Sequence, residues 1–516
     1  MTNKSSCAIV WLKKDLRVQD HRPFYEATQT FNRVVALYIY ESAWFNSYEF
    51  HPSHLQFLNE SLTELENKLA QLNIQLVIRS GEAVEVFKDL KKEFDFECVL
   101  AHQETGNSWT FKRDLMVIDY FKNFGIQFKE YYQFSVIRRL QDRDLWNNYR
   151  VKIIQRKLIP YPKSAPKAES LKSENIRTQF FDKNNYINNK MIQSGGENEA
   201  HQTLNSFLYQ RGQKYLNHIS SPFLSEKSCS RISAYLSFGN LTLTQVHHAL
   251  KQAQQYHPPK SDWSKSLWAF ENRLWWHCHF IQKLESEPEI ENKNMNRAFD
   301  GLRESDFNNS LFEAWKKGET GFPMVDATMR CLQQTGWINF RMRAMLVSFA
   351  SYQLWLHWQK PAEFLAQHFL DFEPGIHFSQ FQMQSGVTGI NAIRIYSPTK
   401  QALDQKGSAQ FIKKYIPELM NVPDDVIHNP SDLEPLLQIE HNCVLGRDYP
   451  LPIVDPKLSY QLAKKRIFEF RTQESVKAQA QDVLKKHASR SHSKARSHFP
   501  KQDRHRPMGN FKKEKD

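Results

Sequence analysis

The sequence lacks a long hydrophobic run. No stretch reaches about 18 uncharged apolar residues, the length that a helix needs to cross a bilayer. The first residues, MTNKSSCAIVWLKK, also lack the profile of a secretory signal peptide. These absences predict a soluble, cytoplasmic protein without membrane contact.

Cysteine is scarce, with 6 residues among 516. The cysteines are scattered, no CxxC pair occurs, and only Cys443 lies beyond Cys331. Such spacing does not supply the ligands of a zinc or iron–sulfur site. We therefore expect reduced thiols that are buried or incidental, and no metal site.

The glycine fingerprint of dinucleotide-binding proteins is also missing. The loop after the first apolar run, residues 13–20, contains no GxGxxG. A nicotinamide-dependent redox enzyme therefore receives little support from the sequence.

Positive charge is in excess. Lys and Arg number 69 against 56 Asp and Glu, which gives a formal net charge of +13. A basic surface attracts phosphate polymers by counterion release, but solubility alone explains the excess equally well. Charge therefore does not decide the partner.

The first part of the chain alternates short apolar runs with segments of helical periodicity. Strands alternating with helices indicate a parallel sheet covered on both faces, so we predict a doubly wound α/β domain over residues 1–135. The expected strands are residues 8–12, 34–40, 75–79, 97–102 and 127–131.

The remaining chain changes character. Residues 136–202 are predicted to be an interdomain linker, because 163–200 are polar with weak periodicity. Residues 203–484 show helical periods rich in Trp and Phe, which predicts an all-α domain. Residues 485–516 are basic with little to bury, which predicts a disordered tail.

Three segments of the helical part carry candidate chemistry. In SCSRISAYLSFGN (228–240), Ser230, Arg231 and Ser233 offer hydroxyls and a guanidinium at the start of a helix, where an anion such as a diphosphate is favoured. Helix caps use the same residue types, so this signal alone is weak.

The second segment, 315–349, places Arg341 and Arg343 two residues apart on a helix, so they point to different sides. The third segment, 369–398, sets Asp371 and Glu373 among apolar residues. A buried carboxylate there needs a partner, and Arg343 is a candidate. His377 follows a Pro-Gly break. A single histidine in such a place is more often a structural residue than a functional one.

Five motifs in order give the sequence a family resemblance. WLKKDLRVQDH, CSRIS, AWKKGETGFPMVDATMR, GWINFRMRAML and RIYSPTKQ resemble the photolyase/cryptochrome family from residue 8 to about 425. The resemblance implies an N-terminal α/β antenna domain, a linker and an α-helical domain that holds FAD. This organisation agrees with the one read from the pattern.

The resemblance also implies site residues. The FAD-binding set is Tyr215, Ser230, Arg231, Ser233, Arg343, Asp371, Glu373 and His377. The DNA-binding set is Trp276 (or Trp275, one register away), Arg341 and Arg394, with the Trp stacking against a flipped pyrimidine lesion. Trp315 and Trp358 resemble the two outer members of the tryptophan chain that photoreduces the flavin.

Four positions depart from the family pattern. Phe381 stands at the inner tryptophan position, so photoreduction is expected to be slow or to detour through Trp337 or Trp355. His377 stands where an asparagine usually faces the flavin N5 and could donate a proton. The remaining two positions are the glutamate that contacts a cyclobutane dimer, which aligns with Arg273 or Asn272, and the neighbouring methionine, which aligns with Ala344.

The sequence does not identify the second chromophore that members of the family bind. The segment 102–114, HQETGNSWTFKRD, follows an expected strand at a place where family members put antenna contacts. Glu104 and Trp109 are the candidate contacts.

The leading functional hypothesis is a blue-light-dependent DNA photolyase, a flavoprotein lyase that acts in DNA repair as a monomer. Its catalytic set would be His377, Trp358, Trp315 and Phe381, and its partner DNA with UV lesions. The departures leave open whether the lesion is a cyclobutane dimer or a (6-4) product. The alternative is a cryptochrome-type photoreceptor that uses FAD photoreduction for signalling.

Overall fold

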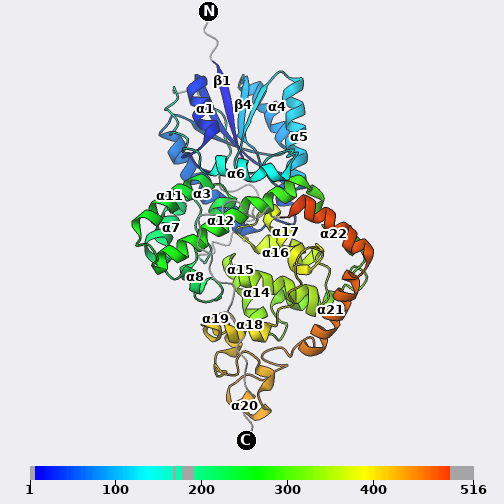
Figure 1. Ribbon diagram of the computed structural model, residues 1–516. Helices are drawn as coiled ribbons and strands as arrows, with labels where there is room; N and C mark the ends of the chain where they lie inside the picture. Colours follow the sequence, from blue (N-terminus) through cyan, green and yellow to red (C-terminus); the bar gives the residue numbers. More distant parts are fainter. Residues whose placement is uncertain (1–5, 167–169, 177–190, 489–516) are drawn as a thin grey trace, which may run out of the picture.

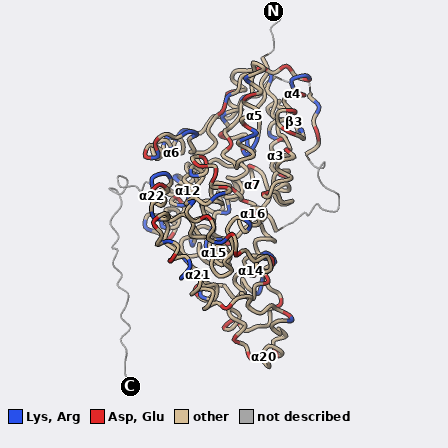
Figure 2. The backbone as a smooth tube through the Cα atoms, turned by 90° about the vertical axis from the view of Figure 1, so that its right-hand side faces the viewer, with Lys and Arg blue, Asp and Glu red and all other residues tan. Residues whose placement is uncertain are grey.

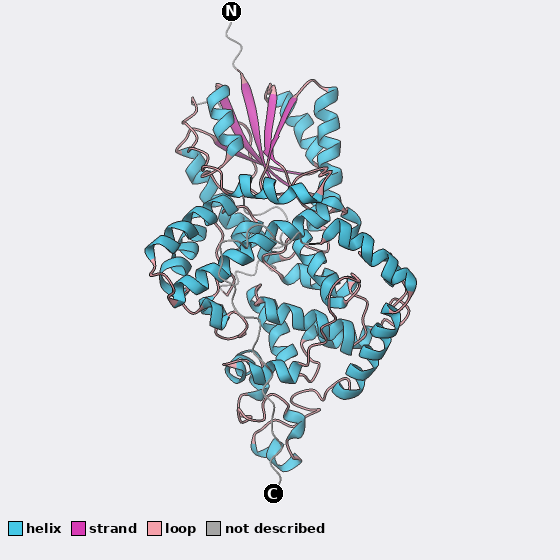
Figure 3. Ribbon diagram, in the orientation of Figure 1, coloured by secondary structure: helices cyan, strands magenta, loops and turns pink. Residues whose placement is uncertain are grey.

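The structure is a computed structural model that describes residues 6–166, 170–176 and 191–488. The N-terminal part forms an α/β domain, and the helical part lies below it in Figure 1. Figure 3 shows the strands gathered in the N-terminal part while helices make up the rest. The predicted fold class, an α/β domain joined to a helical domain, is confirmed.

The N-terminal domain is built on one parallel sheet of five strands in the order β3-β2-β1-β4-β5. The five predicted strands are found, with ends that shift by at most one residue. They are β1 (Cys7–Leu12), β2 (Arg33–Tyr40), β3 (Gln75–Ser80), β4 (Cys98–His102) and β5 (Gln127–Tyr131).

Helices cover both faces of this sheet, which is why its strands are apolar without alternation. Ala8 and Val10 of β1 pack with α1 (Arg22–Thr30) and α3 (Pro52–Ala70). Ile9 and Trp11 face the other side, where they pack with α4 (Ala83–Glu93) and α5 (Ser108–Asn123). The carboxyl ends of the strands point toward the helical domain (Figure 1).

The other helices follow in chain order. They are α2 (Ser42–Phe45), α6 (Trp146–Ile154), α7 (Glu197–Ser206), α8 (Tyr215–His218), α9 (Ser225–Ser228), α10 (Ser233–Ser237), α11 (Leu243–Tyr256), α12 (Asp262–Ser286), α13 (Asn309–Lys317), α14 (Pro323–Thr335) and α15 (Phe340–Ser348). A π-helix, η5 (Phe349–Gln353), prolongs α15. The last seven are α16 (Gln359–His368), α17 (Pro374–Ser385), α18 (Pro398–Asp404), α19 (Ser408–Tyr415), α20 (Pro435–Glu440), α21 (Pro456–Arg471) and α22 (Glu474–His487).

Helices α12 and α17 cross closely in the middle of the helical domain. A side-chain carbon at Gly375 would lie 2.5 Å from the Cα of Ile281, so only glycine allows this approach. The crossing fixes the start of α17, which carries Glu373 and His377, against the long helix α12.

The segment predicted to be the interdomain linker contains helices. Within the predicted linker, α6 buries Trp146 and Ile154, and α7 begins at Glu197. Arg150 of α6 stacks against Trp146 in the same helix and against Trp275 of α12. The contact with Trp275 joins distant segments, so local composition does not reveal it. Residues 167–169 and 177–190 of that linker lie outside the described residues.

The predicted tail starts too early. Lys485, Lys486 and His487 complete the last turn of α22, and His487 and Lys486 both bind the Glu287 carboxylate, at 2.7 and 2.9 Å. Glu287 directly follows α12. Its contacts stabilise a turn of α22 whose composition alone suggests disorder. Residues 489–516 lie outside the described residues. No helix in the described ranges combines the length and apolar character needed to span a bilayer.

Candidate functional site

The site predicted for the flavin centres on an ion pair. Arg343 of α15 donates two parallel hydrogen bonds to Asp371, with Nη1–Oδ1 3.0 Å and Nη2–Oδ2 2.8 Å. The guanidinium also lies 4.1 Å from the centre of the Phe369 ring. Burial raises the pKa of Asp371, but the charge and hydrogen bonds of Arg343 outweigh it and hold this pKa below its usual value.

Two more of the predicted residues act on the same carboxylate. The Ser233 hydroxyl and the charge of Arg231 both favour the ionised form of Asp371 and help to lower its pKa. Arg231 has a left-handed backbone (φ 61°), and its guanidinium lies 4.0 Å from the centre of the Trp337 ring. The structure therefore brings Arg231, Ser233 and Arg343 together around Asp371.

The other two predicted diphosphate residues lie nearby in the chain. Tyr215 is buried and packs edge-on against Phe207, while the Ser230 carbonyl accepts a 2.6 Å bond from Arg211. The helix expected at Ser233 is α10, which has only five residues. An anion here would thus depend on side chains more than on a helix dipole.

His377 lies inside an aromatic cluster of α16 and α17. Its Nε2 is 2.8 Å from the carbonyl oxygen of Ala362, so this nitrogen carries the proton and donates. The rings of Phe372 and Phe381 lie 5.2 and 4.9 Å away. Burial lowers the pKa of His377 to about 4, so the imidazole is neutral near pH 7.

Glu373 faces the N-terminal domain. It is buried, and it lines a small cavity of about 10 Å³ with Lys14 and His102. Its Oε1 has no hydrogen-bond partner among the described residues. Burial raises the pKa of Glu373 to about 7, partly countered by the charge of Lys14.

The two predicted outer tryptophans are both fully buried. Trp358 donates from Nε1 to the side-chain oxygen of Asn294 at 2.7 Å. Trp315 packs between Phe312 and Phe364, and its Nε1 has no partner among the described residues. Neither indole is exposed to solvent, so a proton lost from either would first pass to a protein group.

The register of the DNA-facing tryptophan follows from α12. Trp276 is 43% exposed and stacks on Phe280, with ring centres 5.8 Å apart. Trp275 points away, with the Arg150 guanidinium 4.1 Å from its ring. Trp276 shares a helix face with Arg273, so Trp276 is the one presented at the surface.

Residues of α15 lie close to this face of α12. The Arg273 guanidinium is 6.0 Å from the ring centre of Phe340, which is 47% exposed. Arg341 approaches the Tyr396 hydroxyl at 3.4 Å, on the loop that also carries Arg394. We name the set of the exposed Arg273, Trp276 and Phe340 and the half-buried Arg341 the aromatic–cationic mouth. Of the two remaining aligned positions, Asn272 is exposed and Ala344 is buried.

An interdomain cavity of about 90 Å³ opens at the carboxyl ends of β1, β2 and β4. Both candidate antenna residues line it: Trp109 donates to Glu49 at 2.7 Å, and Glu104 pairs with Arg113. Lys14 lines it too. Burial lowers the pKa of Lys14, but the charges of Glu373, Glu49 and Glu104 more than offset this and raise it.

Sequence reasoning missed Lys14, Glu49 and Arg113 as cavity residues. A signal existed for Lys14, because it is the second residue after a buried parallel strand, and ligands bind beyond the carboxyl ends of such strands. Arg113 lies in the segment 102–114 that was predicted to make antenna contacts, but was not singled out there, and Glu49 comes from a separate segment that carried no comparable signal.

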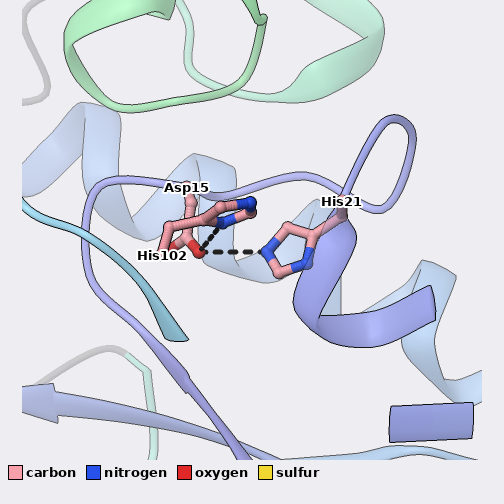
Figure 4. Close-up of side chains that lie close together, drawn as sticks. All are labelled: Asp15, His21 and His102. Atoms are coloured by element: carbon pink, nitrogen blue, oxygen red, sulfur yellow. Dashed lines mark hydrogen bonds and ion pairs between the residues drawn. The ribbon is translucent and has the colours of Figure 1, made fainter. Parts of the chain in front are cut away.

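Asp15, His21 and His102 form a buried cluster with the spacing of metal ligands (Figure 4). The Asp15 carboxylate accepts from His21 Nε2 at 3.0 Å and from His102 Nδ1 at 2.8 Å. His21 Nδ1 accepts the backbone N–H of Phe24, which leaves the ring proton on Nε2. A protonated Nε2 has no lone pair for a metal, so hydrogen bonding accounts for this cluster.

Comparisons with known proteins identify the family of the chain. Residues 8–138 match the family model "DNA photolyase", and residues 270–469 match "FAD binding domain of DNA photolyase". The chain is 27% identical over 476 residues to Cryptochrome DASH of Gloeobacter violaceus, covering 87% of this chain and 93% of that one. It is 26% identical over 485 residues to a deoxyribodipyrimidine photo-lyase of Agrobacterium fabrum, covering 88% and 96%.

Solved structures share the fold. A bacterial class III photolyase from Agrobacterium tumefaciens superposes with a TM-score of 0.78 at 24% identity, covering 92% of this chain and 99% of that one. An archaeal photolyase from Sulfolobus tokodaii, solved with two FAD molecules, gives 0.70 at 22% identity and covers 90% and 100%. The chain belongs to the photolyase/cryptochrome superfamily.

Proposed function

We propose that this protein is a blue-light-dependent DNA photolyase that repairs UV-induced pyrimidine lesions. The observation that carries the proposal is the convergence of Arg231, Ser233 and Arg343 on Asp371, on elements that also carry the exposed Phe340 and the half-buried Arg341. A charged cofactor site beside an aromatic and cationic surface is the combination that such a reaction requires.

The donor set fits FAD. Arg231 and the hydroxyls of Ser230 and Ser233 would hold the diphosphate, and Tyr215 would lie beside them. Arg343 would place a cation against the isoalloxazine while Asp371 fixes the guanidinium in orientation. By resemblance Glu373 would accept a hydrogen bond from the ring's polar edge, whereas its neighbours in the structure are Lys14 and His102 of the N-terminal domain. Reduced FAD supplies the electron that splits the lesion after absorbing blue light.

The mouth would position the damaged strand. Trp276 offers an open indole face for a flipped pyrimidine, because a stacked base cannot reach a buried flavin. Arg341 and Arg394 would bind flanking phosphates, which adds affinity without sequence preference. Acidic and basic residues are interleaved along the backbone of both domains in Figure 2.

The interdomain cavity would receive a second chromophore. Trp109 and Tyr38 provide aromatic surface, while Lys14 and Arg113 provide cations among the carboxylates of Glu41, Glu49 and Glu104. This mixture suits a planar heteroaromatic molecule that carries its own hydrogen-bonding groups. The Sulfolobus tokodaii photolyase, with its two FAD molecules, offers a precedent for a second flavin.

A photoreceptor that uses FAD photoreduction for signalling is the second candidate. Two observations favour it: His377 stands at the position that faces the flavin N5, and Arg273 or Asn272 replaces the carboxylate that contacts a dimer. Neither change removes a residue of the FAD-binding set, and the second removes a repair contact. The exposed Trp276 and its cationic neighbours favour repair instead.

The test is repair in vitro with protein that has FAD bound and fully reduced. One oligonucleotide carries a single cyclobutane dimer and another a single (6-4) product, and each is illuminated with blue light and analysed by chromatography. We expect light-dependent restoration of one of the two. Trp276→Ala serves as a variant that should bind FAD normally and repair poorly.

Dark samples and an undamaged oligonucleotide are the controls. Restoration of neither lesion by the reduced, FAD-loaded protein would reject the photolyase proposal and favour the photoreceptor. Equal repair by Trp276→Ala would instead support the photolyase activity and show that this indole does not contact the lesion.

A further inference from the structure

A tyrosine of the N-terminal domain donates its hydroxyl proton to a buried carboxylate of the helical domain. Tyr48 Oη lies 2.9 Å from Glu291 Oε1. Tyr48 follows α2, and Glu291 ends the 3-10 helix η3 (Pro288–Glu291) after α12. Glu291 is 6% exposed, and its other oxygen accepts from the hydroxyl and, at 2.7 Å, from the backbone N–H of Ser108. The carboxylate is therefore fixed in place, and neither member of the pair belongs to the sets proposed above for FAD, DNA or the second chromophore.

A phenyl ring connects Tyr48 to Trp358, one of the two tryptophans expected to pass electrons to FAD. The centre of the Phe378 ring lies 6.1 Å from that of Tyr48 and 6.3 Å from that of Trp358. Phe378 and Trp358 are 1% and 0% exposed, and Tyr48 packs against the same hydrophobic cluster. The phenol and the indole are thus connected through closely packed side chains, which is the arrangement that an electron transfer between them requires.

Trp358 has no base beside it that could take its proton after oxidation. Its Nε1 donates to the side-chain oxygen of Asn294 at 2.7 Å, and a neutral amide oxygen accepts a hydrogen bond but is not basic. The indole is fully buried, so solvent does not replace this acceptor. An oxidised Trp358 therefore stays a radical cation until a neighbouring group supplies an electron.

The hydroxyl of Tyr48 meets the chemical requirement for such a donor. A phenol gives up an electron easily only when its proton leaves at the same time, because the phenol radical cation is strongly acidic. Burial and the charge of Glu291 raise the pKa of Tyr48, so the phenol keeps its proton in the resting protein. Glu291 Oε1 already accepts a hydrogen bond from this proton and can take it without movement of either side chain.

A pair of the same kind occurs at Tyr449, whose hydroxyl donates to the Asp326 carboxylate. Tyr449 is 1% exposed, and Asp326 also accepts from the backbone N–H groups of residues 320 and 321. The ring contacts of Trp358 are with His357 and Phe378, so in the described part of the chain no aromatic ring leads from Trp358 to Tyr449. This second pair shares the chemistry of the first and lacks its position.

We propose that Tyr48 is the electron donor that reduces oxidised Trp358, with Glu291 as its proton acceptor. One electron passes from the phenol to the Trp358 radical cation while the O–H proton moves to Glu291 Oε1. The products are neutral Trp358, a neutral tyrosyl radical and protonated Glu291. A thiol in solution then restores the phenol by giving up a hydrogen atom, and Glu291 releases its proton. The inference rests on the proposed function only in that FAD photoreduction must oxidise Trp358.

The test uses FAD-loaded protein with the flavin oxidised, prepared with and without deuterium on the tyrosine rings. Samples are illuminated with blue light and frozen, and electron paramagnetic resonance identifies a tyrosyl radical by the narrowing of its spectrum on deuteration. We expect this signal in the unmodified protein and its loss in Tyr48→Phe. In transient absorption, the tryptophan radical cation should live severalfold longer in Tyr48→Phe and in Glu291→Gln. Deuterium oxide should slow its decay in the unmodified protein and not in Tyr48→Phe, since only the former couples the decay to a proton transfer.

Tyr449→Phe is the matched control, because it removes a carboxylate-bonded phenol that has no ring path to Trp358, and it should keep both the signal and the lifetime. FAD content should be the same in all variants. A tyrosyl signal that persists in Tyr48→Phe would overturn the proposal, as would the absence of a tyrosyl radical from the illuminated unmodified protein. Repair starts from reduced FAD, so chemically reduced Tyr48→Phe should repair as well as the unmodified protein, and the two proposals can fail separately.

Discussion

Arg343 and Asp371 are joined by two parallel hydrogen bonds across 28 residues of sequence, with the carboxylate nearly buried and the guanidinium 26% exposed. Asp371→Asn would leave Arg343 without its countercharge. We expect a loss of about 2 kcal/mol in the free energy of unfolding, below the value for a fully buried pair. FAD content after purification, measured by absorbance, should fall with it.

Asp306→Asn is the control for this variant, since Asp306 pairs with Arg466 through a half-exposed contact. Such pairs contribute little, so its stability and FAD content should match the unmodified protein. Full FAD occupancy in Asp371→Asn would show that the pair does not hold the cofactor.

His377 should make stability depend on pH. Burial lowers its pKa from 6.5 to about 4, so the unfolded chain binds a proton more readily than the folded one between these values. Stability conferred by the neutral ring is present above pH 6.5 and is lost as pH falls toward 4. Between pH 7 and pH 5 we expect a loss of about 2 kcal/mol that His377→Asn does not show.

Urea denaturation of both proteins at the two pH values measures this difference directly. The comparison isolates one group, because every other histidine is common to the two proteins. Parallel losses of stability in the two proteins would mean that His377 is protonated as easily in the fold as in the unfolded chain.

Phe381→Trp should speed photoreduction of the bound oxidised FAD. Phe381 is buried on α17 beside His377, and a phenyl ring is much harder to oxidise than an indole. The larger ring should also lower stability by about 1–3 kcal/mol through overpacking. Transient absorption after a blue pulse provides the measurement, with Phe364→Trp beside Trp315 as the control. An unchanged rate in Phe381→Trp would exclude a broken chain at this position.

The strands and motifs could be predicted because their signals are local. Five apolar runs bounded by polar turns predicted the strands to within a residue. Arg343 could be named as the partner of Asp371 because a carboxylate among apolar residues needs a cation. Trp276 needed the structure, since only the packing of Trp275 on Arg150 decides which indole is exposed. The Tyr48–Glu291 hydrogen bond joins residues that lie 243 apart in the sequence, so neither segment carries a pattern that predicts it.

Trp109→Ala should remove the second chromophore without removing FAD. The indole lines the interdomain cavity and donates to Glu49, so its loss takes away both aromatic surface and the partner of a buried carboxylate. Phe111→Ala on the same helix is the control, because that ring is 44% exposed. Chromatography of the extracted chromophores gives the ratio to FAD, which should fall severalfold in Trp109→Ala alone. An unchanged ratio in Trp109→Ala would mean that the second chromophore binds elsewhere or is not bound.

Arg341→Gln should weaken DNA binding in a salt-dependent way. Arg341 reaches Tyr396 at the mouth, so its guanidinium is held where a phosphate beside a flipped base would lie. Removing one phosphate contact should lower the slope of log affinity against log salt by about 1 and weaken binding equally for all sequences. Fluorescence anisotropy with a UV-damaged oligonucleotide at several salt concentrations measures both quantities. Arg447→Gln, near the tip formed by α20, removes a 70% exposed cation and should change neither. If the two variants lose affinity to the same extent, the protein binds DNA through its net charge, and the mouth has no particular role.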